Sequence, residues 1–353
     1  MKRRPEPIGG PLGAAGEWVF RAAVLLRNTL YDRRILRSVR LGAPVASVGN
    51  LSVGGTGKTP VAIALASILL GEGRRPALLS RGYGRERAGR IVAMPPGEEP
   101  GPRGHLLYGD EPCLVRLRLP DLPIVLGADR VRTGRLAIDR FGADFLLLDD
   151  GMQHRRLARD LDIVLVPGVR PFGNGRLLPR GTLREPPGAL RRAGLVLVRA
   201  LEGTDENLDA VLDRAGAPAA RIRFTYETIG VLLPTGATAD ARTFLSGRRV
   251  LAVSGIGSPE SFEKTIEETG ARIAGRLRFP DHHRFDCEDR ARIAQSAARI
   301  GALAVTTEKD RSRLAPEEAE RAGLHTLRVE VRFQDPEGRL PALLAALGEE
   351  DLP

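Results

Sequence analysis

Residues 48–60 read VGNLSVGGTGKTP and begin at the end of the apolar stretch 44–48. In a glycine-rich turn, successive backbone N–H groups can point into one concavity, which makes a cradle for phosphate groups. Lys58 can reach the outer phosphates as a point charge, and the Thr59 hydroxyl can bind Mg²⁺. The apolar run 61–70 predicts a helix whose positive N-terminal end faces the anion. The sequence therefore predicts nucleotide contacts from Ser52, Val53, Gly54, Gly55, Thr56, Gly57, Lys58 and Thr59.

The loop is a variant of the usual motif, because Ser52 stands where the consensus has glycine. Lysine occurs at only four positions among the 54 basic residues, and Lys58 is one of them. Because the broad planar fork of arginine would not fit the cradle, a lysine here indicates a phosphate-binding role. A glycine-rich turn without a ligand is the simpler alternative, and the strand before it and the helix after it count against that interpretation.

The composition limits the classes of partner. The 353 residues are enough for two domains with separate cores, and the net charge of +10 indicates nucleic acid, anionic lipid or a phosphorylated substrate. Only 4% of the residues are aromatic, which leaves few stacking surfaces for single strands, so no nucleic-acid partner is expected. Cys113 and Cys287 follow no metal or redox spacing, and no signal peptide is visible, which predicts a reduced cytoplasmic setting.

The first forty residues contain an arm and a helix. Residues 1–16 are rich in Pro, Gly and Arg and predict a poorly ordered arm. Residues 18–30 are apolar but interrupted by Arg21 and Arg27, so they are too short to span a bilayer. They suit a helix that lies in the headgroup region of a membrane, or equally a helix packed on its own domain.

The rest of the chain alternates apolar strands with helical stretches, which predicts a parallel sheet covered by helices on both faces. The expected strands include residues 76–80, 123–126, 145–148, 163–166 and 195–198. A second, smaller α/β unit follows, with strands at 249–254, 272–279 and 302–306 and helices at 259–268 and 290–300. The segments 221–233 and 327–333 are interpreted as paired hinge strands. The prediction is a P-loop NTPase-type domain (41–225) and a smaller α/β domain (226–334), flanked by an N-terminal arm and interfacial helix (1–40) and a C-terminal helix and tail (335–353).

Several polar side chains follow these apolar strands, where ligands of such sheets gather. Asp149 and Asp150 end the strand 145–148 and could hold Mg²⁺, although adjacent acids also cap helices. Residues 109–112, GDEP, would be only a helix-capping turn if taken alone. Residues 281–283, DHH, indicate either surface hydrogen bonding or a histidine that tunes a catalytic carboxylate.

Two irregular loops carry arginines that could clamp anionic groups. Residues 80–85, SRGYGR, place Arg81 at a strand end, where a solvated basic loop is the alternative interpretation. Residues 172–186 are too irregular for a core element and long enough to line a site.

Seven blocks of the chain, taken together, resemble the tetraacyldisaccharide 4'-kinases. They are residues 48–60, 80–85, 109–112, 148–155, 172–186, 281–282 and 307–310. The resemblance implies ATP- and Mg²⁺-dependent phosphorylation of the 4'-hydroxyl of tetraacyldisaccharide 1-phosphate, which gives lipid IVA in lipid A synthesis. It also implies an anionic glycolipid substrate and a peripheral place at the cytoplasmic face of the inner membrane. We expect the chain to act as a monomer.

The resemblance also implies roles for single residues. Asp110 matches the family's catalytic base, and His282 matches the residue paired with it, which domain closure would bring to Asp110. Asp149 and Asp150 match the metal-associated acids. Further contacts to metal, phosphate or acceptor are expected from Arg81, Glu111, Arg130, Gln153, Arg184 and Glu185. For residues 307–310 a helix-capping turn is the simpler interpretation.

Two other classes of ATPase compete with this interpretation. Membrane-cycling ATPase switches pair a similar loop with a membrane helix, but they carry an extra lysine early in the loop, where this chain has Val53. A basic nucleic-acid ATPase would bind DNA or RNA with a steep dependence on salt. The three classes differ in the acceptor of the γ-phosphate. A kinase of this family transfers it to a lipid, an ATPase switch transfers it to water, and a nucleic-acid ATPase transfers it to water only when nucleic acid is present.

Overall fold

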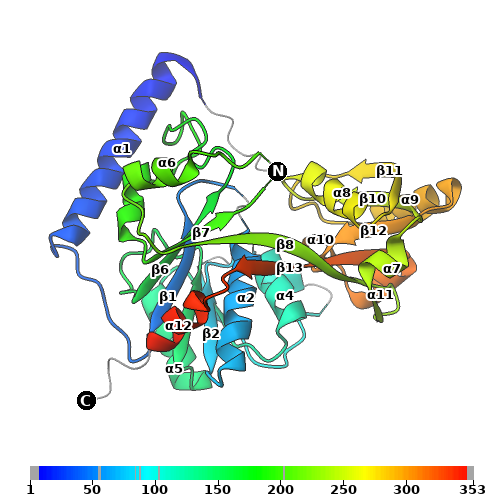
Figure 1. Cartoon of the computed structure of the whole chain (residues 1–353). Helices are drawn as coiled ribbons and strands as arrows, with labels where there is room; N and C mark the ends of the chain where they lie inside the picture. The colour runs from blue at the N-terminus through cyan, green and yellow to red at the C-terminus, as the bar shows by residue number, and fades with distance from the viewer. Residues whose placement is uncertain are drawn as a thin grey trace.

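The structure is a computed structural model that describes residues 8–54, 57–83, 85–86, 89–101, 104–201 and 203–347. One mostly parallel sheet runs through the whole molecule (Figure 1). In spatial order its strands are β11 (Arg272–Arg278), β10 (Arg249–Ser254), β12 (Leu303–Thr307), β13 (Leu324–Gln334), β8 (Arg221–Leu232), β7 (Leu195–Arg199), β6 (Leu161–Pro167), β1 (Val45–Asn50), β5 (Phe145–Asp149), β2 (Pro76–Ser80), β4 (Ile124–Leu126) and β3 (Val92–Met94), and β9 (Thr238–Ala239) pairs with β8. The predicted α/β class with a parallel sheet is confirmed.

We call residues 33–220 and 335–347 the large lobe. Its central strands are apolar and buried on both faces, as β5 with the sequence FLLLD illustrates, because helices cover both sides. One face packs against α2 (Lys58–Gly71), α4 (Asp110–Arg118) and α12 (Arg339–Ala346). The other face packs against α5 (Arg130–Phe141), α6 (Leu208–Arg214) and the 3₁₀ turn Pro187–Arg192. The short α3 (Gly104–Leu107) precedes α4.

The two lobes are joined by the long antiparallel strands β8 and β13, which run side by side from one lobe into the other (Figure 1). Phe333 is paired with Phe224, so the expected pairing of these two segments is confirmed. The two rings lie 6.4 Å apart, and Tyr226 packs edge-on against Phe224 at 5.8 Å. These aromatic contacts stabilise the strand pair where it leaves the large lobe.

We call residues 233–323 the small lobe. It stacks the parallel strands β10, β11 and β12 between two helical layers. Its helices are α7 (Ala241–Leu245), α8 (Pro259–Glu268), α9 (Cys287–Ile300), α10 (Glu308–Arg311) and α11 (Pro316–Arg321). Two apolar clusters fill the two faces of this part of the sheet. The strands expected at 249–254, 272–279 and 302–306 lie within one residue of those observed.

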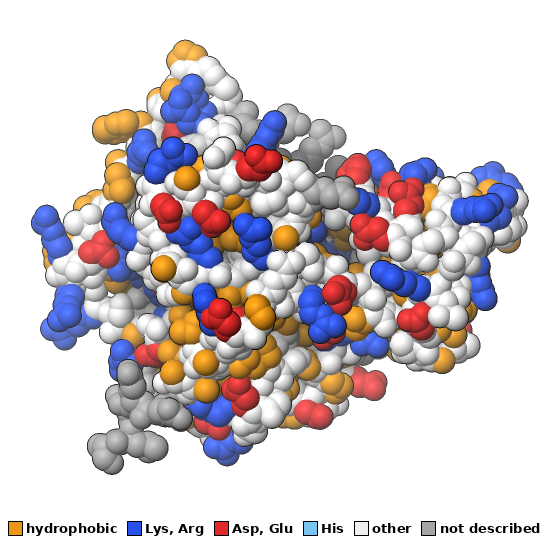
Figure 2. All heavy atoms as spheres, viewed as in Figure 1, with side chains coloured by type: hydrophobic (Ala, Val, Ile, Leu, Met, Phe, Trp, Pro, Cys, Tyr) orange, Lys and Arg blue, Asp and Glu red, His pale blue; other side chains and the backbone are white. Residues whose placement is uncertain are grey.

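The N-terminal helix α1 spans Gly10–Asp32. The arm predicted at 1–16 is therefore too long, because the helix begins seven residues before residue 17 with a proline in its first turn, where proline is tolerated; residues 1–7 lie outside the described part. The buried side of α1 rests on the large lobe, whereas its outer side carries exposed apolar side chains, among them Trp18 at 72% exposure. Figure 2 shows such side chains along the outer edge of the molecule, interspersed with basic ones. Within the described ranges, no helix combines the length and the hydropathy needed to cross a membrane.

Candidate active site

The phosphate-loop segment joins β1 to α2, as its sequence predicts. Gly57 precedes α2 with φ of 87°, a left-handed conformation that glycine adopts without strain. The Nζ of Lys58 lies 3.3 Å from Asn50 Oδ1 and 3.5 Å from Asp150 Oδ1. Gly55 and Thr56, two of the predicted contacts, lie outside the described residues. The described loop residues thus lie around the positively polarised N-terminal end of α2, and the Lys58 ammonium group lies beside them.

Asp149 ends β5 beside the first turn of α2. Its Oδ2 accepts a hydrogen bond of 3.2 Å from the Thr59 hydroxyl, and its Oδ1 is buried without a partner in the described part of the chain. Burial and the nearby charge of Glu111 raise the pKa of Asp149 to about 7. A buried carboxylate beside a hydroxyl and a helix N-terminus has the chemistry of a Mg²⁺ ligand, because Mg²⁺ takes one or two carboxylates together with phosphate oxygens and water.

Asp150 is used differently from its neighbour. Its two carboxylate oxygens each accept a bond of 2.9 Å from Arg184, and its φ of 55° is unusual for a residue other than glycine. Arg184 also donates to the carbonyl of Ser52 at 3.2 Å and to Asn50, so it braces the phosphate loop. Burial alone would raise the pKa of Asp150, but the Arg184 bonds and the charge of Lys58 outweigh burial and hold it below its usual range.

One cavity is lined by Lys58, Thr59, Asp149, Asp150 and Arg184, and three more predicted residues line it with them. Gln153 donates from Nε2 to the carbonyl of Asn50 at 3.1 Å, which ties the end of β1 to the segment after β5. Arg130 at the start of α5 is buried and donates to the Gly127 carbonyl. Burial lowers the pKa of Arg130 to about 10, against the opposing charge of Asp149. Arg81 lines the cavity at the end of β2.

Glu185 lies outside the cavity, contrary to the predicted contact with acceptor or phosphate. Its side chain is 0% exposed and accepts bonds from Asn28 Nδ2 at 2.8 Å and Arg192 Nη2 at 2.9 Å. Arg27 lies 3.4 Å from its other oxygen. Glu185 therefore fastens α1 to the large lobe. No local sequence pattern indicates this role, because the contact that fastens α1 joins Glu185 to Asn28, 157 residues away.

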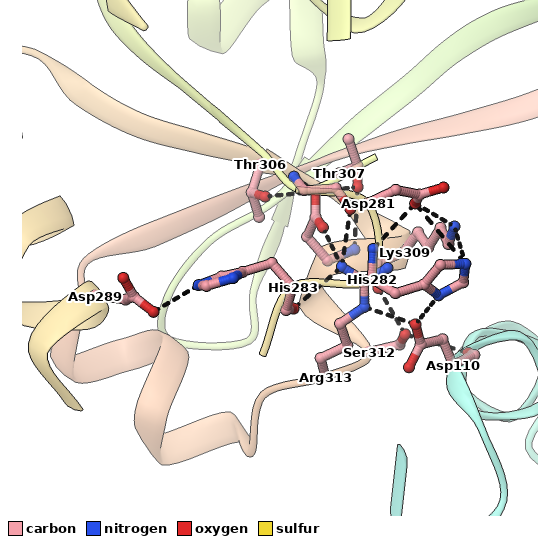
Figure 3. A network of polar contacts seen from close by, with 12 residues as sticks. Asp110, Asp281, His282, His283, Asp289, Thr306, Thr307, Lys309, Ser312 and Arg313 are labelled. Carbon is pink, nitrogen blue, oxygen red and sulfur yellow. Dashed lines mark hydrogen bonds and ion pairs between the residues drawn. The ribbon is translucent and has the colours of Figure 1, made fainter. Parts of the chain in front are cut away.

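Asp110, the predicted base, is the first residue of α4 and faces a cluster of small-lobe side chains (Figure 3). Its Oδ2 lies 2.8 Å from His282 Nδ1 and 2.8 Å from Arg313 Nε. The residues expected to meet on domain closure are thus already in contact. Burial would raise the pKa of Asp110, but the bonds and charges of His282 and Arg313 together lower it. Asp110 is therefore held as a carboxylate between two cationic or polar donors.

The neighbouring histidine, His283, does not contact Asp110. His283 points away from Asp110 in Figure 3, binds Asp289 Oδ2 through Nε2 at 2.6 Å and stacks on Phe279 with ring centroids 4.6 Å apart.

The capping turn expected at 307–310 is confirmed, because Thr307 caps α10 by accepting from the Asp310 amide. Arg313 was missed by sequence reasoning, and its only local signal is the three-residue spacing from Asp310.

A single cavity of about 1750 Å³ unites these groups. The large lobe contributes Lys58, Thr59, Arg81, Glu111, Arg130, Asp149, Asp150, Gln153 and Arg184, and the small lobe contributes Asp281, His282 and Lys309. The phosphate loop and His282, which binds Asp110, thus line one cavity from opposite lobes. Such an arrangement can hold a triphosphate at one side and present a hydroxyl to a carboxylate base at the other.

Comparisons with known proteins agree with this geometry. The family model described as Tetraacyldisaccharide-1-P 4'-kinase matches residues 12–348. A tetraacyldisaccharide 4'-kinase of Anaeromyxobacter dehalogenans (strain 2CP-C) is 46% identical, over 98% of this chain and 93% of the relative, and one of Syntrophus aciditrophicus (strain SB) is 45% identical, over 85% and 83%. The crystal structure of LpxK from Aquifex aeolicus in complex with ATP superposes with a TM-score of 0.74 at 29% identity, covering 94% of this chain and 96% of that one. The chain belongs to the tetraacyldisaccharide-1-P 4'-kinase family.

Proposed function

We propose that this chain transfers the γ-phosphate of ATP to the 4'-hydroxyl of tetraacyldisaccharide 1-phosphate, which gives lipid IVA. The observation that carries the proposal is the cavity of about 1750 Å³, which is lined both by Lys58 and Thr59 and by His282. Lys58 and Thr59 belong to the phosphate cradle, and His282 binds Asp110, so the candidate base lies next to the cavity. The named relatives and the ATP complex of the Aquifex protein support the same nucleotide and acceptor.

The chain's own residues divide the work of an in-line transfer. Lys58 and the amides of the phosphate loop hold the β- and γ-phosphate oxygens, and Asp110 accepts the proton of the acceptor hydroxyl. Thr59 and Asp149 would hold Mg²⁺, with Asp150 and Glu111 nearby, since Asp149 Oδ1 is buried without a partner in the described ranges. Mg²⁺, when bound, neutralises charge on the transferring phosphoryl group.

The acceptor is proposed to lie between the arginines of the large lobe and His282. Arg81 and Arg130 both line the cavity, and forked guanidinium groups suit a phosphate such as the 1-phosphate of the acceptor. Arg184 is committed to Asp150 and to the loop, so its role is to hold the cradle in shape. Gln153 supports the same region through the carbonyl of Asn50.

We also propose that α1 rests on the cytoplasmic face of the inner membrane, with the protein bound peripherally. Its outer side exposes Leu12, Trp18, Val19, Leu25 and Leu26, and its other side is fastened to the large lobe through Glu17 and Asn28. An apolar stripe beside arginines suits the interface of an anionic membrane. Both lobes and α1 come from one chain, so the proposal needs only a monomer.

The decisive experiment identifies the molecule that receives the γ-phosphate of ATP. Purified protein receives γ-labelled ATP, Mg²⁺ and detergent-dispersed tetraacyldisaccharide 1-phosphate, and a Lys58→Met variant serves as the control. We expect label on a bis-phosphorylated glycolipid with the wild type and almost none with Lys58→Met. Label that appears only as inorganic phosphate would instead support an ATPase switch and would contradict the proposed kinase.

A further inference from the structure

Helix α4 is held to the small lobe at both of its ends, although it packs on the sheet of the large lobe. At its first residue, Asp110 Oδ2 lies 2.8 Å from Arg313 Nε, and the Asp110 carbonyl accepts from Ser312 Oγ at 3.3 Å. At its last residue, Arg118 Nε lies 2.8 Å from Glu308 Oε1. The two attachments are about 12 Å apart along the helix axis. Both reach one short segment of the small lobe, residues 307–313.

The Arg313 side chain is held in a fixed position within that segment, which we call its seat. Its side chain is 1% exposed, and its Nη1 donates to Asp310 Oδ1 at 2.7 Å and to the Gly255 carbonyl at 3.1 Å. Asp310 is itself fully buried and accepts from the Gly255 amide at 3.0 Å and from Thr307 Oγ1 at 2.8 Å. A Cβ on Gly255 would approach Asp310 Oδ1 to 3.0 Å, so the seat is closely packed. The guanidinium therefore has one position, which the core of the small lobe determines.

The contact between Arg313 and Asp110 determines which oxygen of the Asp110 carboxylate is available for the reaction. Arg313 Nε and His282 Nδ1 both bind the same oxygen, Oδ2 (Figure 3). A base must direct one oxygen to the hydroxyl whose proton it takes. With Oδ2 occupied by two donors, Oδ1 is the oxygen that remains for the acceptor.

We propose that Arg313 is a positioning residue for the phosphoryl transfer, which, seated on Asp310, holds the Asp110 carboxylate by Oδ2, while Arg118 and Glu308 hold the other end of α4. This rests on the kinase function proposed above. It gives the segment 307–310 a role besides capping α10, because Glu308 and Asp310 are the two anchors. Removing Arg313 would also leave Asp310 buried without its cationic partner, so stability is measured beside the kinetics.

The test separates kcat from KM. In Arg313→Gln we expect kcat to fall about 10²-fold, the effect of misplacing a catalytic group by about 1 Å, while KM for ATP stays within about threefold. Arg313→Lys keeps a charge without the planar fork and should lie between the wild type and Arg313→Gln. The matched control is Arg311→Gln, because Arg311 bonds within the small lobe, to the Leu314 carbonyl at 2.7 Å, and should keep its kcat.

A double-mutant cycle with Asp110→Asn tests whether Arg313 acts through Asp110. If it does, Arg313→Gln should lower kcat little further in the Asp110→Asn background, because residues that act as a unit are not additive. Equal losses in both backgrounds, or a normal kcat in Arg313→Gln, would overturn the proposal. Thermal unfolding is measured in parallel, and if Arg313→Gln does not fold, the cycle is run with Arg313→Lys. An inactive wild type would contradict the kinase function, whereas an active wild type with an active Arg313→Gln contradicts only the positioning role.

The far end of α4 offers a second matched pair. Arg116 and Arg118 lie on the same helix, but Arg116 donates to the carbonyls of Met94 and Pro95 within the large lobe, at 3.0 and 2.6 Å. We expect Arg118→Gln to lower kcat about tenfold through Asp110 and Arg116→Gln to leave it within about threefold. The same kcat in both variants would restrict the positioning role to Arg313.

Discussion

Tyr226, on the strand that joins the two lobes, lies directly over Gly57 of the phosphate loop. A Cβ on Gly57 would come within 1.8 Å of the Tyr226 hydroxyl oxygen, which lies 3.5 Å from the Gly57 carbonyl. The guanidinium carbon of Arg199 lies over the tyrosine ring, 4.7 Å from the ring centroid. The position of β8 is therefore coupled by direct contact to the loop that is proposed to hold the nucleotide.

Gly57→Ala should weaken ATP binding for two reasons. The φ of 87° at Gly57 is unfavourable for alanine, and the new methyl group would displace either Tyr226 or the loop. We expect the Kd for ATP, measured by calorimetry, to rise at least tenfold. Gly73→Ala is the matched control, because Gly73 has φ of 75° with open space around it, so it reports strain alone.

Tyr226→Phe separates the two reasons in the Gly57→Ala background. Removing the hydroxyl leaves the ring carbon Cζ as the nearest atom, 3.1 Å from the added Cβ. ATP affinity should therefore recover in part in the double variant. A double variant no better than Gly57→Ala would mean that backbone strain, and not the contact with β8, is the cause.

The two adjacent histidines should behave oppositely. His282→Ala removes a donor 2.8 Å from Asp110, so kcat should fall about 10²-fold, at the lower end of the usual share of acid–base catalysis, with little change in ATP binding. His283→Ala should keep kcat but lose about 1–2 kcal/mol of unfolding free energy, since it removes a hydrogen bond to Asp289 and the stacking on Phe279. Kinetics and urea unfolding of both variants check this, and a kcat loss in His283→Ala would contradict it.

Asp149→Asn should remove the magnesium-dependent part of ATP binding. At a concentration one hundred times its Kd, a ligand raises the free energy of unfolding by about 2.7 kcal/mol. We expect ATP with Mg²⁺ to stabilise the wild type more than ATP with EDTA, and this difference to disappear in Asp149→Asn. Asp144→Asn is the control, because Asp144 lies just before the opposite end of β5 and pairs with Arg75 at 3.3 Å on the surface. A Mg²⁺ effect that persists in Asp149→Asn would remove Asp149 from the metal site.

The elements that sequence reasoning located are those with a local signal. The phosphate loop is a contiguous motif, and β5 and β10 are apolar runs that end in polar residues. The short edge strand β3 and the helix α5 escaped, because β3 has three residues and α5 mixes arginines with a narrow apolar stripe. Local patterns describe one element at a time, so the continuity of the sheet through β8 and β13 appears only when the strands are assembled.

The candidate site shows the same limit. Asp110 and His282 were identified by resemblance, and their contact joins residues 172 positions apart. Arg313 is one arginine in a chain with 54 basic residues, and its three-residue spacing from Asp310 is too common a pattern to distinguish it from a surface side chain. Glu185 shows the reverse error, because a residue within a functional-looking loop proves to be a buried anchor for α1.

Glu185→Gln should therefore reduce stability and spare catalysis. The substitution removes a buried charge that faces Arg192 at 2.9 Å, so we expect a loss of about 1–3 kcal/mol in the free energy of unfolding. Glu260→Gln, in an exposed pair with Arg278, should cost at most about 1 kcal/mol. Urea unfolding with parallel kcat measurements tests both, and a large fall in kcat for Glu185→Gln at full folding would return Glu185 to the reaction.

The exposed apolar side chains on the outer side of α1 predict that this helix binds membranes. Trp18 and Leu26 are 72% and 61% exposed, and burying such a side chain in a bilayer interface gains about 1.5–3 kcal/mol. Each of Trp18→Ser and Leu26→Ser should then weaken sedimentation with anionic phospholipid vesicles about tenfold. Leu70→Ser is the control, because Leu70 is an exposed leucine on α2. If both α1 variants sediment as the wild type does, the exposed apolar side of α1 is not the membrane contact, and α1 serves only to cover the large lobe.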